Sequence, residues 1–186
     1  MIAVADSVRV HSPAQPNAKP NPIEALMQTV SASRLNCWLN CRLKFYFRYI
    51  EKVRKSPTAA LHVGTVVHAV LQAWNMARWR KQAFQLQNFK TVFDLGWADQ
   101  PAKIDWNDEE PNQKSTGWSL LDCYFKETPI KANEMPEAVE VPMETDLSKY
   151  GLPTLIGVVD LVRAGGRIVD FKTAGKTPNA DDAIRL

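Results

Sequence analysis

One segment near the C-terminus places three charges inside apolar, strand-like sequence. From residue 157 to residue 173 it reads GVVDLVRAGGRIVDFKT, which predicts two strands, about 153–163 and 167–173, joined by a glycine turn. An unpaired buried charge costs several kcal/mol, so two acids and a lysine are seldom kept in one hairpin for packing alone. The economical interpretation is a divalent cation held by Asp160 and Asp170, with Lys172 beside it. The hairpin therefore predicts a metal-dependent enzyme that acts on phosphates.

The length of the turn decides whether the two acids meet. If the turn consists of residues 164–166, Asp160 lies directly opposite Asp170, with Cβ atoms about 4.5–5.5 Å apart. Like charges repel at that distance, and a hard cation such as Mg²⁺ or Mn²⁺ between them would turn the repulsion into attraction. Two alternatives stay open: a two-residue turn would move Asp160 off this face, and an exposed hairpin could carry ordinary surface ion pairs.

Composition bounds the class of protein. The chain has 186 residues and a formal charge of +3, too small to imply nucleic-acid binding by itself. Three cysteines without a Cys-x-x-Cys pair argue against a disulfide framework and suit a reducing compartment. The sequence has no apolar run long enough to span a membrane and no signal peptide, so we expect a cytoplasmic protein without membrane attachment.

Periodicity predicts an α/β domain with a helical N-terminal half packed on a small mixed sheet. Four prolines within residues 1–24 indicate a flexible tail, which leaves residues 25–186 for the domain. The predicted helices run from Ser31 or Ser33 to about Tyr49 and over about 61–81, 84–98 and 115–132, with a loop at 105–112. A strand follows at 137–147. Both hairpin strands are apolar on two faces, as strands covered by helices on both sides tend to be.

A block of basic residues precedes the second helix. The segment from Arg34 to Lys55, ends included, contains seven basic residues and a single acid, Glu51. Such a stripe suits a phosphate backbone. The candidate DNA-binding side chains are Arg34, Arg42 and Arg48. We expect Trp38 and Phe45 in the core, while Tyr46 and Tyr49 could either pack inward or stack on unpaired bases.

Taken together, these motifs resemble the PD-(D/E)XK nuclease superfamily, specifically its RecB-like exonuclease branch with CRISPR-associated and AddB-type nucleases. The resemblance covers about 31–175 and follows the order of the branch. The motifs are Ser31-Ala-Ser33-Arg-Leu35, the Cys41–Tyr49 segment, Gly64-Thr-Val-Val-His68, Gly157-Val-Val-Asp160 and Asp170-Phe-Lys172. Gly64 either starts its helix or allows a close approach of the sheet.

The resemblance implies a restriction-endonuclease-like fold, with a mixed central sheet flanked by helices, and a role for each matched residue. His68, Asp160, Asp170 and the backbone carbonyl of Phe171 would bind Mg²⁺ or Mn²⁺, and Lys172 would orient or activate the attacking water. The implied reaction is hydrolysis of DNA phosphodiesters by an exonuclease of repair, recombination or phage DNA processing. The implied partners are DNA ends or single strands, with a helicase or recombination protein as a candidate. The alternative is a catalytically inactive DNA-binding or scaffold module.

Some features depart from the branch. Its helix with a Gln-x-x-x-Tyr motif should begin about where the chain ends, so we expect the C-terminal helix to be missing. Some relatives hold an iron–sulfur cluster on four cysteines, which the three present do not support; Cys41 would then be a small apolar helix residue. Glu140 is interpreted as a solvated strand residue and stays outside the predicted site.

Overall fold

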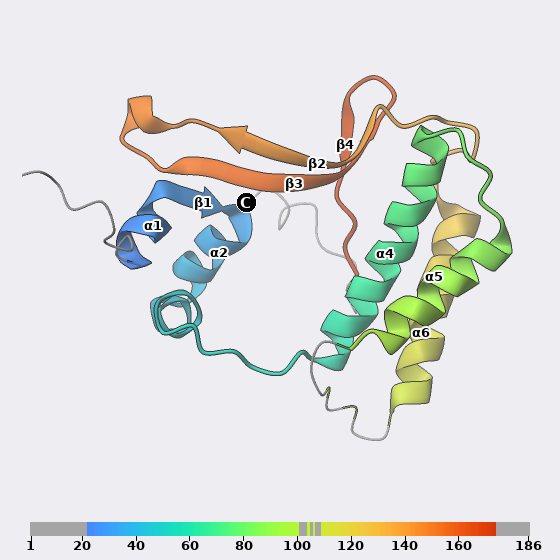
Figure 1. Ribbon diagram of the computed structural model, residues 1–186, viewed down its shortest axis with the longest axis horizontal. Helices are drawn as coiled ribbons and strands as arrows, with labels where there is room; N and C mark the ends of the chain where they lie inside the picture. The colour runs from blue at the N-terminus through green and yellow to red at the C-terminus, as the bar shows by residue number, and fades with distance from the viewer. Residues whose placement is uncertain (1–21, 101–103, 105, 107–108, 174–186) are drawn as a thin grey trace, which may run out of the picture.

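The structure, a computed structural model, describes residues 22–100, 104, 106 and 109–173. Its helical and sheet elements form two groups joined by a long hairpin (Figure 1). The first group contains the helices α1 (Pro22–Gln28), α2 (Ala32–Asn40) and α3 (Arg42–Phe45), the π-helix η1 (Tyr46–Ile50) and the strand β1 (Thr29–Ser31). The second group contains the helices α4 (Ala59–Trp79), α5 (Leu86–Ala98) and α6 (Glu110–Glu127). The remaining elements are β2 (Ala138–Thr145), the short 3₁₀-helix η2 (Ser148–Tyr150), β3 (Thr154–Arg163) and β4 (Arg167–Val169).

The four strands form one mixed sheet, which confirms the predicted α/β class. The long strand β3 pairs antiparallel with β2 along one edge. On its other edge, β3 pairs in parallel with β1 at residues 154–156 and antiparallel with β4 at residues 161–163. Within the described part of the chain, residues 157–160 of β3 therefore have a strand partner on one edge only. That open stretch carries the Gly157-x-x-Asp160 motif.

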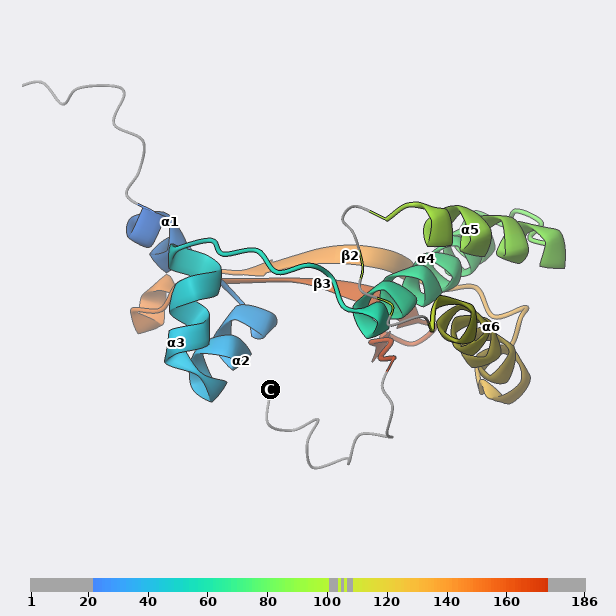
Figure 2. The same cartoon turned by 90° about the horizontal axis from the view of Figure 1, so that it is seen from below.

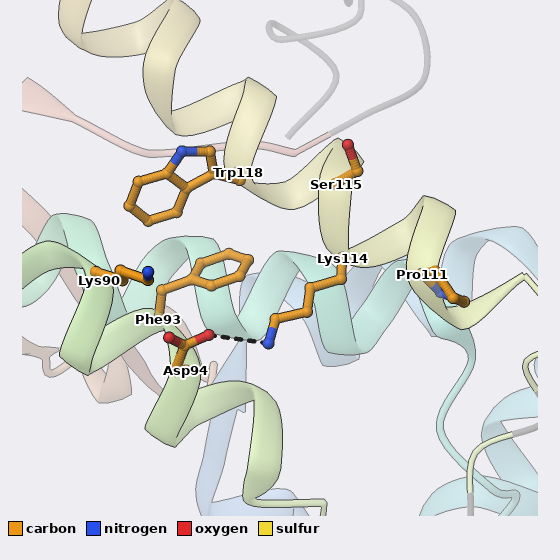
Figure 3. A pocket seen from close by; sticks show the side chains of 7 residues that line it. All are labelled: Lys90, Phe93, Asp94, Pro111, Lys114, Ser115 and Trp118. Carbon is orange, nitrogen blue, oxygen red and sulfur yellow. Dashed lines mark ion pairs between the residues drawn. The ribbon is translucent and has the colours of Figure 1, made fainter.

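The helices α4, α5 and α6 form the main core. Their buried apolar residues meet in one cluster: Val63, Val66, Val67, Val70, Leu71, Phe93, Trp97 and Leu121. Figure 3 shows how α5 and α6 meet, with Phe93 edge-on to Trp118 (ring centroids 5.2 Å apart) and Lys114 paired with Asp94 at 2.9 Å. Helix α6 begins at Glu110, so the predicted loop ends earlier than expected, because Pro111 sits in the first turn, where no backbone N–H is needed.

The N-terminal prediction of one helix to Tyr49 is wrong. Cys41 breaks it with an extended backbone (φ −160°, ψ 104°), and its Sγ accepts a hydrogen bond from the Lys44 N–H to cap α3, so Cys41 is not a small apolar helix residue. Ser31 does cap α2, accepting from the Arg34 N–H at 3.3 Å. Helix α1 begins at Pro22, inside the predicted tail, and the short β1 was not predicted; residues 1–21 and the segment after 173 lie outside the described residues.

Two predictions about burial are also wrong. The hairpin strands are not covered on both faces: Leu161 is 1% exposed, whereas Val158 is 59% exposed and Ile168 is exposed as well. The ladder of β4 ends at Val169 rather than at residue 173. Trp38, expected in the core, is exposed too. Apolar sequence on two faces predicted burial of both, but within β3 only Val159 and Leu161 are buried. Among the described residues, no helix has the length and apolar character to cross a bilayer.

Leu161 offers a test of this one-sided packing. It contacts the cluster of Ile130 and Val139 and is almost fully buried, so Leu161→Ala should lower the free energy of unfolding by about 2–5 kcal/mol. On the same strand, Val158→Ala should cost under about 1 kcal/mol, since its side chain is already mostly in water. Urea denaturation followed by circular dichroism would measure both. Equal losses would mean that both faces of β3 are covered.

Candidate active site

The hairpin turn has the three-residue form on which the metal hypothesis depends. Arg163 pairs with Arg167 across residues 164–166, and the two glycines of the turn, Gly165 and Gly166, have φ of 78° and 71°, a region that suits glycine. This register carries Asp160 toward the level of Asp170. The ladder stops one residue before Asp170, however, so the two acids are not a cross-strand pair.

The Asp160 carboxylate instead holds the backbone after β4. Its Oδ2 accepts a hydrogen bond from the Phe171 N–H at 2.7 Å, and its side chain is mostly buried, with 15% exposed. A charged acceptor makes this hydrogen bond stronger than a neutral one. Asp160 therefore fixes the position of the Asp170-Phe-Lys172 segment relative to β3.

Asp170 and Lys172 lie on the outer side of that segment. They share a face, as strand alternation predicts, and the Lys172 Nζ pairs with the Asp170 Oδ2 at 2.8 Å. The Asp170 side chain is 55% exposed and that of Lys172 is 63% exposed. An ion pair this open contributes little to stability, about 0–1 kcal/mol, so both groups can turn toward a ligand at small cost.

Phe171 points the other way and anchors the segment. Its ring packs against both apolar clusters, the helical one and the one around Leu161. It lies edge-on to Tyr124 of α6, with ring centroids 5.7 Å apart, and edge-on to His68 of α4 at 6.2 Å. The alternation of Asp170, Phe171 and Lys172 thus separates an anchoring face from a charged face.

His68 reaches the site from α4. Its Nδ1 lies 3.9 Å from the Asp160 Oδ2, so the structure brings together two of the predicted ligands from distant parts of the sequence. They line a cleft of about 660 Å³ between α4 and the hairpin, together with Gly64, Gln72, Glu140 and Thr173 among other residues. Asp170 and Lys172 are not among the residues that line it.

Gly64 lies well inside α4, which decides between the two roles that the sequence left open for it. A Cβ at this position would meet the Thr173 Oγ1 at 2.7 Å, closer than such atoms come. The absence of a side chain therefore lets Thr173 lie against α4. In Figure 1 the chain from β4 to residue 173 descends alongside that helix.

Glu140 belongs to the site, although the sequence interpretation had placed it in solvent. The pairs Val139–Leu161 and Val141–Val159 put it opposite Asp160. Burial, and then the neighbouring charge of Asp160, raise the pKa of the Glu140 carboxyl, while His68 acts in the opposite direction. Its φ of 52° is unusual for a strand residue. The register of β2 on β3, which depends on the connection through η2, was the signal that sequence reasoning lacked.

The donors present suit a hard divalent cation, but they are not gathered in advance. His68, Glu140 and Asp160 supply one imidazole and two opposed carboxylates, ligands that Mg²⁺ or Mn²⁺ accepts. Yet no three His, Cys, Asp or Glu side chains in the described residues stand close enough to hold a metal together. Asp170 turns toward Lys172 instead of the cleft. The cysteines form no cluster either: Cys37 is buried, while Cys41 and Cys123 are exposed.

The three predicted DNA-binding arginines differ in their surroundings. Arg34 is tied to the protein, because its Nη1 donates to the backbone carbonyls of Thr29 (2.6 Å) and Leu26 (3.3 Å). Arg42 lies over the Trp38 ring at 5.2 Å and is exposed. Arg48 lies over the Tyr49 ring at 5.5 Å and is exposed as well. Arg42 and Arg48 thus have guanidinium groups free for a phosphate, whereas the guanidinium group of Arg34 stabilises the backbone before α2.

A double-mutant cycle would test the close approach at Gly64. Gly64→Ala should gain up to about 1 kcal/mol of helix propensity but lose about 1–3 kcal/mol to the clash with Thr173. In a Thr173→Ala background the clashing oxygen is gone, so the same substitution should stabilise the protein. Thermal denaturation of the four proteins gives the coupling energy, and a value near zero would contradict the contact.

Glu140→Gln tests the opposed carboxylates. A raised pKa means that the folded state binds the proton more tightly, so Glu140 begins to cost stability as the pH rises above its unfolded pKa. The cost is complete above its folded pKa and disappears as the pH falls. Without metal, Glu140→Gln should therefore raise stability near pH 7.5 by roughly 0.2–1 kcal/mol, with little effect at pH 4. Melting curves at the two pH values measure this, and the exposed Glu144→Gln on the same strand is the control. A loss of stability at pH 7.5 would contradict the repulsion.

Comparison with known proteins agrees with this geometry. No curated protein matches the sequence. A family model described as the PD-(D/E)XK nuclease superfamily matches residues 29–185, which include the cleft, the hairpin and the segment after β4. Nucleases of this superfamily generally use divalent metal ions such as Mg²⁺. The chain belongs to the PD-(D/E)XK nuclease superfamily.

Proposed function

We propose that this chain is a Mg²⁺- or Mn²⁺-dependent DNA exonuclease of the RecB-like branch, with residues 25–186 as its nuclease domain. Its role would lie in DNA repair, recombination or phage DNA processing, with a helicase or recombination protein as partner. The observation that carries the proposal is the junction at Asp160. There the carboxylate bonds the Phe171 N–H and lies 3.9 Å from the His68 Nδ1. The helix motif of His68 and the two hairpin motifs, which are distant from it in sequence, thus meet at the Asp160 carboxylate.

Each residue of this site has a proposed task. His68, Asp160, Asp170 and the Phe171 carbonyl would hold the metal, and Glu140 is near enough to Asp160 to join them. When bound, the cation would polarise the scissile phosphate and lower the pKa of a bound water. Lys172 already lies beside a proposed ligand, Asp170. From that position its ammonium group would orient the attacking water and offset the negative charge that develops on the phosphate.

Asp170→Asn is the direct test of the catalytic proposal. Replacing one ligand oxygen by an amide should slow Mn²⁺-dependent degradation of linear DNA by more than about 100-fold, because partners one step further from a metal already cost about 10–100-fold. The matched control is Asp122→Asn, an exposed acid of α6 in a comparable ion pair with Lys126, which should keep full activity. Release of acid-soluble nucleotides measures the rate. Unchanged degradation by Asp170→Asn would rule out this site.

The exonuclease mode has a separate test on the same protein. A linear duplex offers ends and a covalently closed circle of the same sequence offers none, so only the linear form should be degraded. Equal rates on the two forms would contradict the exonuclease assignment and leave the metal-dependent site in place.

A non-catalytic DNA-binding or scaffold module is the second candidate. Two observations favour it: Asp170 and Lys172 form an exposed ion pair with each other, and no three-ligand cluster is assembled among the described residues. Calorimetric titration with Mn²⁺ distinguishes the two. The nuclease should bind Mn²⁺ and lose most of that affinity in Asp160→Asn, whereas a scaffold should show no binding that depends on Asp160.

A further inference from the structure

A second groove, away from the cleft, lies along α3, η1 and the linker that follows them. Its volume is about 900 Å³. The residues that line it are Cys41, Leu43, Lys44, Phe47, Arg48, Tyr49, Val53, Arg54 and Lys55. Four of these carry a positive charge and none carries a negative one, so the groove suits a polyanion.

The charges of this groove are available. In the part of the chain that the structure describes, none of Lys44, Arg48, Arg54 and Lys55 forms an ion pair with a carboxylate. The nearest acid in sequence, Glu51, is occupied elsewhere, because its Oε1 accepts a hydrogen bond from the Tyr46 hydroxyl at 2.5 Å. Tyr46 and Trp38 line a different, apolar groove beside α1 and β3. The fold thus separates the acid from the cations of its own segment.

Phe47 is the aromatic side chain of this groove whose ring is free to contact a ligand. It is 47% exposed, whereas the ring of Tyr49 has the guanidinium groups of Arg34 and Arg48 over it, at 5.6 and 5.5 Å. A base can stack on an exposed ring of this kind, and such stacking does not depend on sequence. Only unpaired bases have a free face, so the ring selects single strands over duplex.

The backbone around Phe47 has an unusual shape. Tyr46–Ile50 form a π-helix, closed by the hydrogen bond from the Glu51 N–H to the Tyr46 carbonyl. Directly after it, Lys52 has a φ of 54°, a left-handed conformation uncommon outside glycine. Turns of this kind are frequent at functional sites. Here the turn brings Phe47 and Arg48 into one groove with the linker residues Val53, Arg54 and Lys55.

The linker connects this groove to the cleft. Lys55 lines the groove and Ala60 lines the cleft, and the five residue-to-residue steps from one Cα atom to the other span at most roughly 18 Å. Figures 1 and 2 show the linker running from η1 to the start of α4. A strand held in the groove therefore needs to extend only a short way to reach His68 and Asp160.

We propose that the groove of Lys44, Phe47, Arg54 and Lys55 binds single-stranded DNA and leads it to the cleft between α4 and β3. This inference rests on the proposed nuclease function and assigns its substrate form. The cations would neutralise phosphates, and Phe47 would stack on an unpaired base. Binding should therefore be strong for a single strand without sequence preference, weaker for a duplex, and steeply dependent on salt.

The test measures binding apart from cleavage. Fluorescence anisotropy of labelled dT20 in EDTA should show tighter binding than that of a 20-bp duplex. The triple variant Lys44→Gln, Arg54→Gln, Lys55→Gln should bind dT20 at least about tenfold more weakly, and its slope of log K against log salt should shrink by about 2, at about 0.7 for each lost phosphate contact. The charge-matched control removes Lys81, Lys90 and Lys131 as glutamines. These exposed lysines belong to the α4–α6 half, and their loss should change dT20 affinity far less.

Phe47 gives a second variant that keeps the charge. Phe47→Leu should weaken dT20 binding by about tenfold and leave duplex binding unchanged, while Phe47→Trp should restore the affinity. Circular dichroism would show that each variant is folded. Equal losses from the groove triple and its control, or equal affinity for dT20 and duplex, would overturn the proposal.

The two proposals can fail independently. Metal-dependent degradation of DNA by a protein whose dT20 affinity ignores every groove variant would overturn the groove and leave the nuclease standing. Binding of dT20 that depends on the groove, without degradation in Mn²⁺, would support the groove and overturn the nuclease.

Discussion

The hydrogen bond from the Phe171 N–H to the Asp160 carboxylate is the interaction on which the site depends. It joins the hairpin strand β3 to the chain after β4 at the point where regular pairing ends. The ring of Phe171 then packs into both apolar clusters, so the same residue is held by its backbone on one side and its side chain on the other. Asp170 and Lys172 flank it and are presented to solvent as a consequence. Removing either anchor would release the charged segment from α4.

The architecture leaves room for chemistry because the sheet is interrupted there. Strands β1 and β4 share one edge of β3 and leave residues 157–160 without a strand partner on that edge among the described residues. Backbone and side chains in such a gap can face a ligand. On the other edge, β2 brings Glu140 opposite Asp160, and the two carboxylates repel each other while no cation lies between them. The strain in this arrangement is electrostatic, and a divalent ion is the species that would relieve it.

The break at Cys41 and the π-helix help to divide the aromatic and basic residues of the N-terminal half between two grooves. Trp38 and Tyr46 face an apolar groove beside α1 and β3, whereas Phe47 and the cations Lys44, Arg54 and Lys55 face a second one. Helical spacing alone places Lys44 and Phe47 on one face, but it does not bring the linker residues Arg54 and Lys55 beside them. The π-helix and the left-handed Lys52 redirect the chain, so that the linker leaves the end of η1 toward the start of α4 (Figure 2).

The sequence by itself determined the α/β class, the glycine turn of the hairpin and the alternation that puts Asp170 and Lys172 on one face, because these follow from local periodicity and turn chemistry. It left open the length of that turn and the choice between Ser31 and Ser33 as the helix cap, which the structure decided. It also predicted His68 and Asp160 as partners, through the order of their motifs. Only the tertiary structure decided that Glu140 meets Asp160, that Thr173 passes against Gly64, that Asp170 turns outward to Lys172, and that Arg34 serves the fold. These contacts depend on the register between strands and on how closely α4 approaches the hairpin. Both are set by the packing of residues far apart in the chain, which a local pattern does not contain.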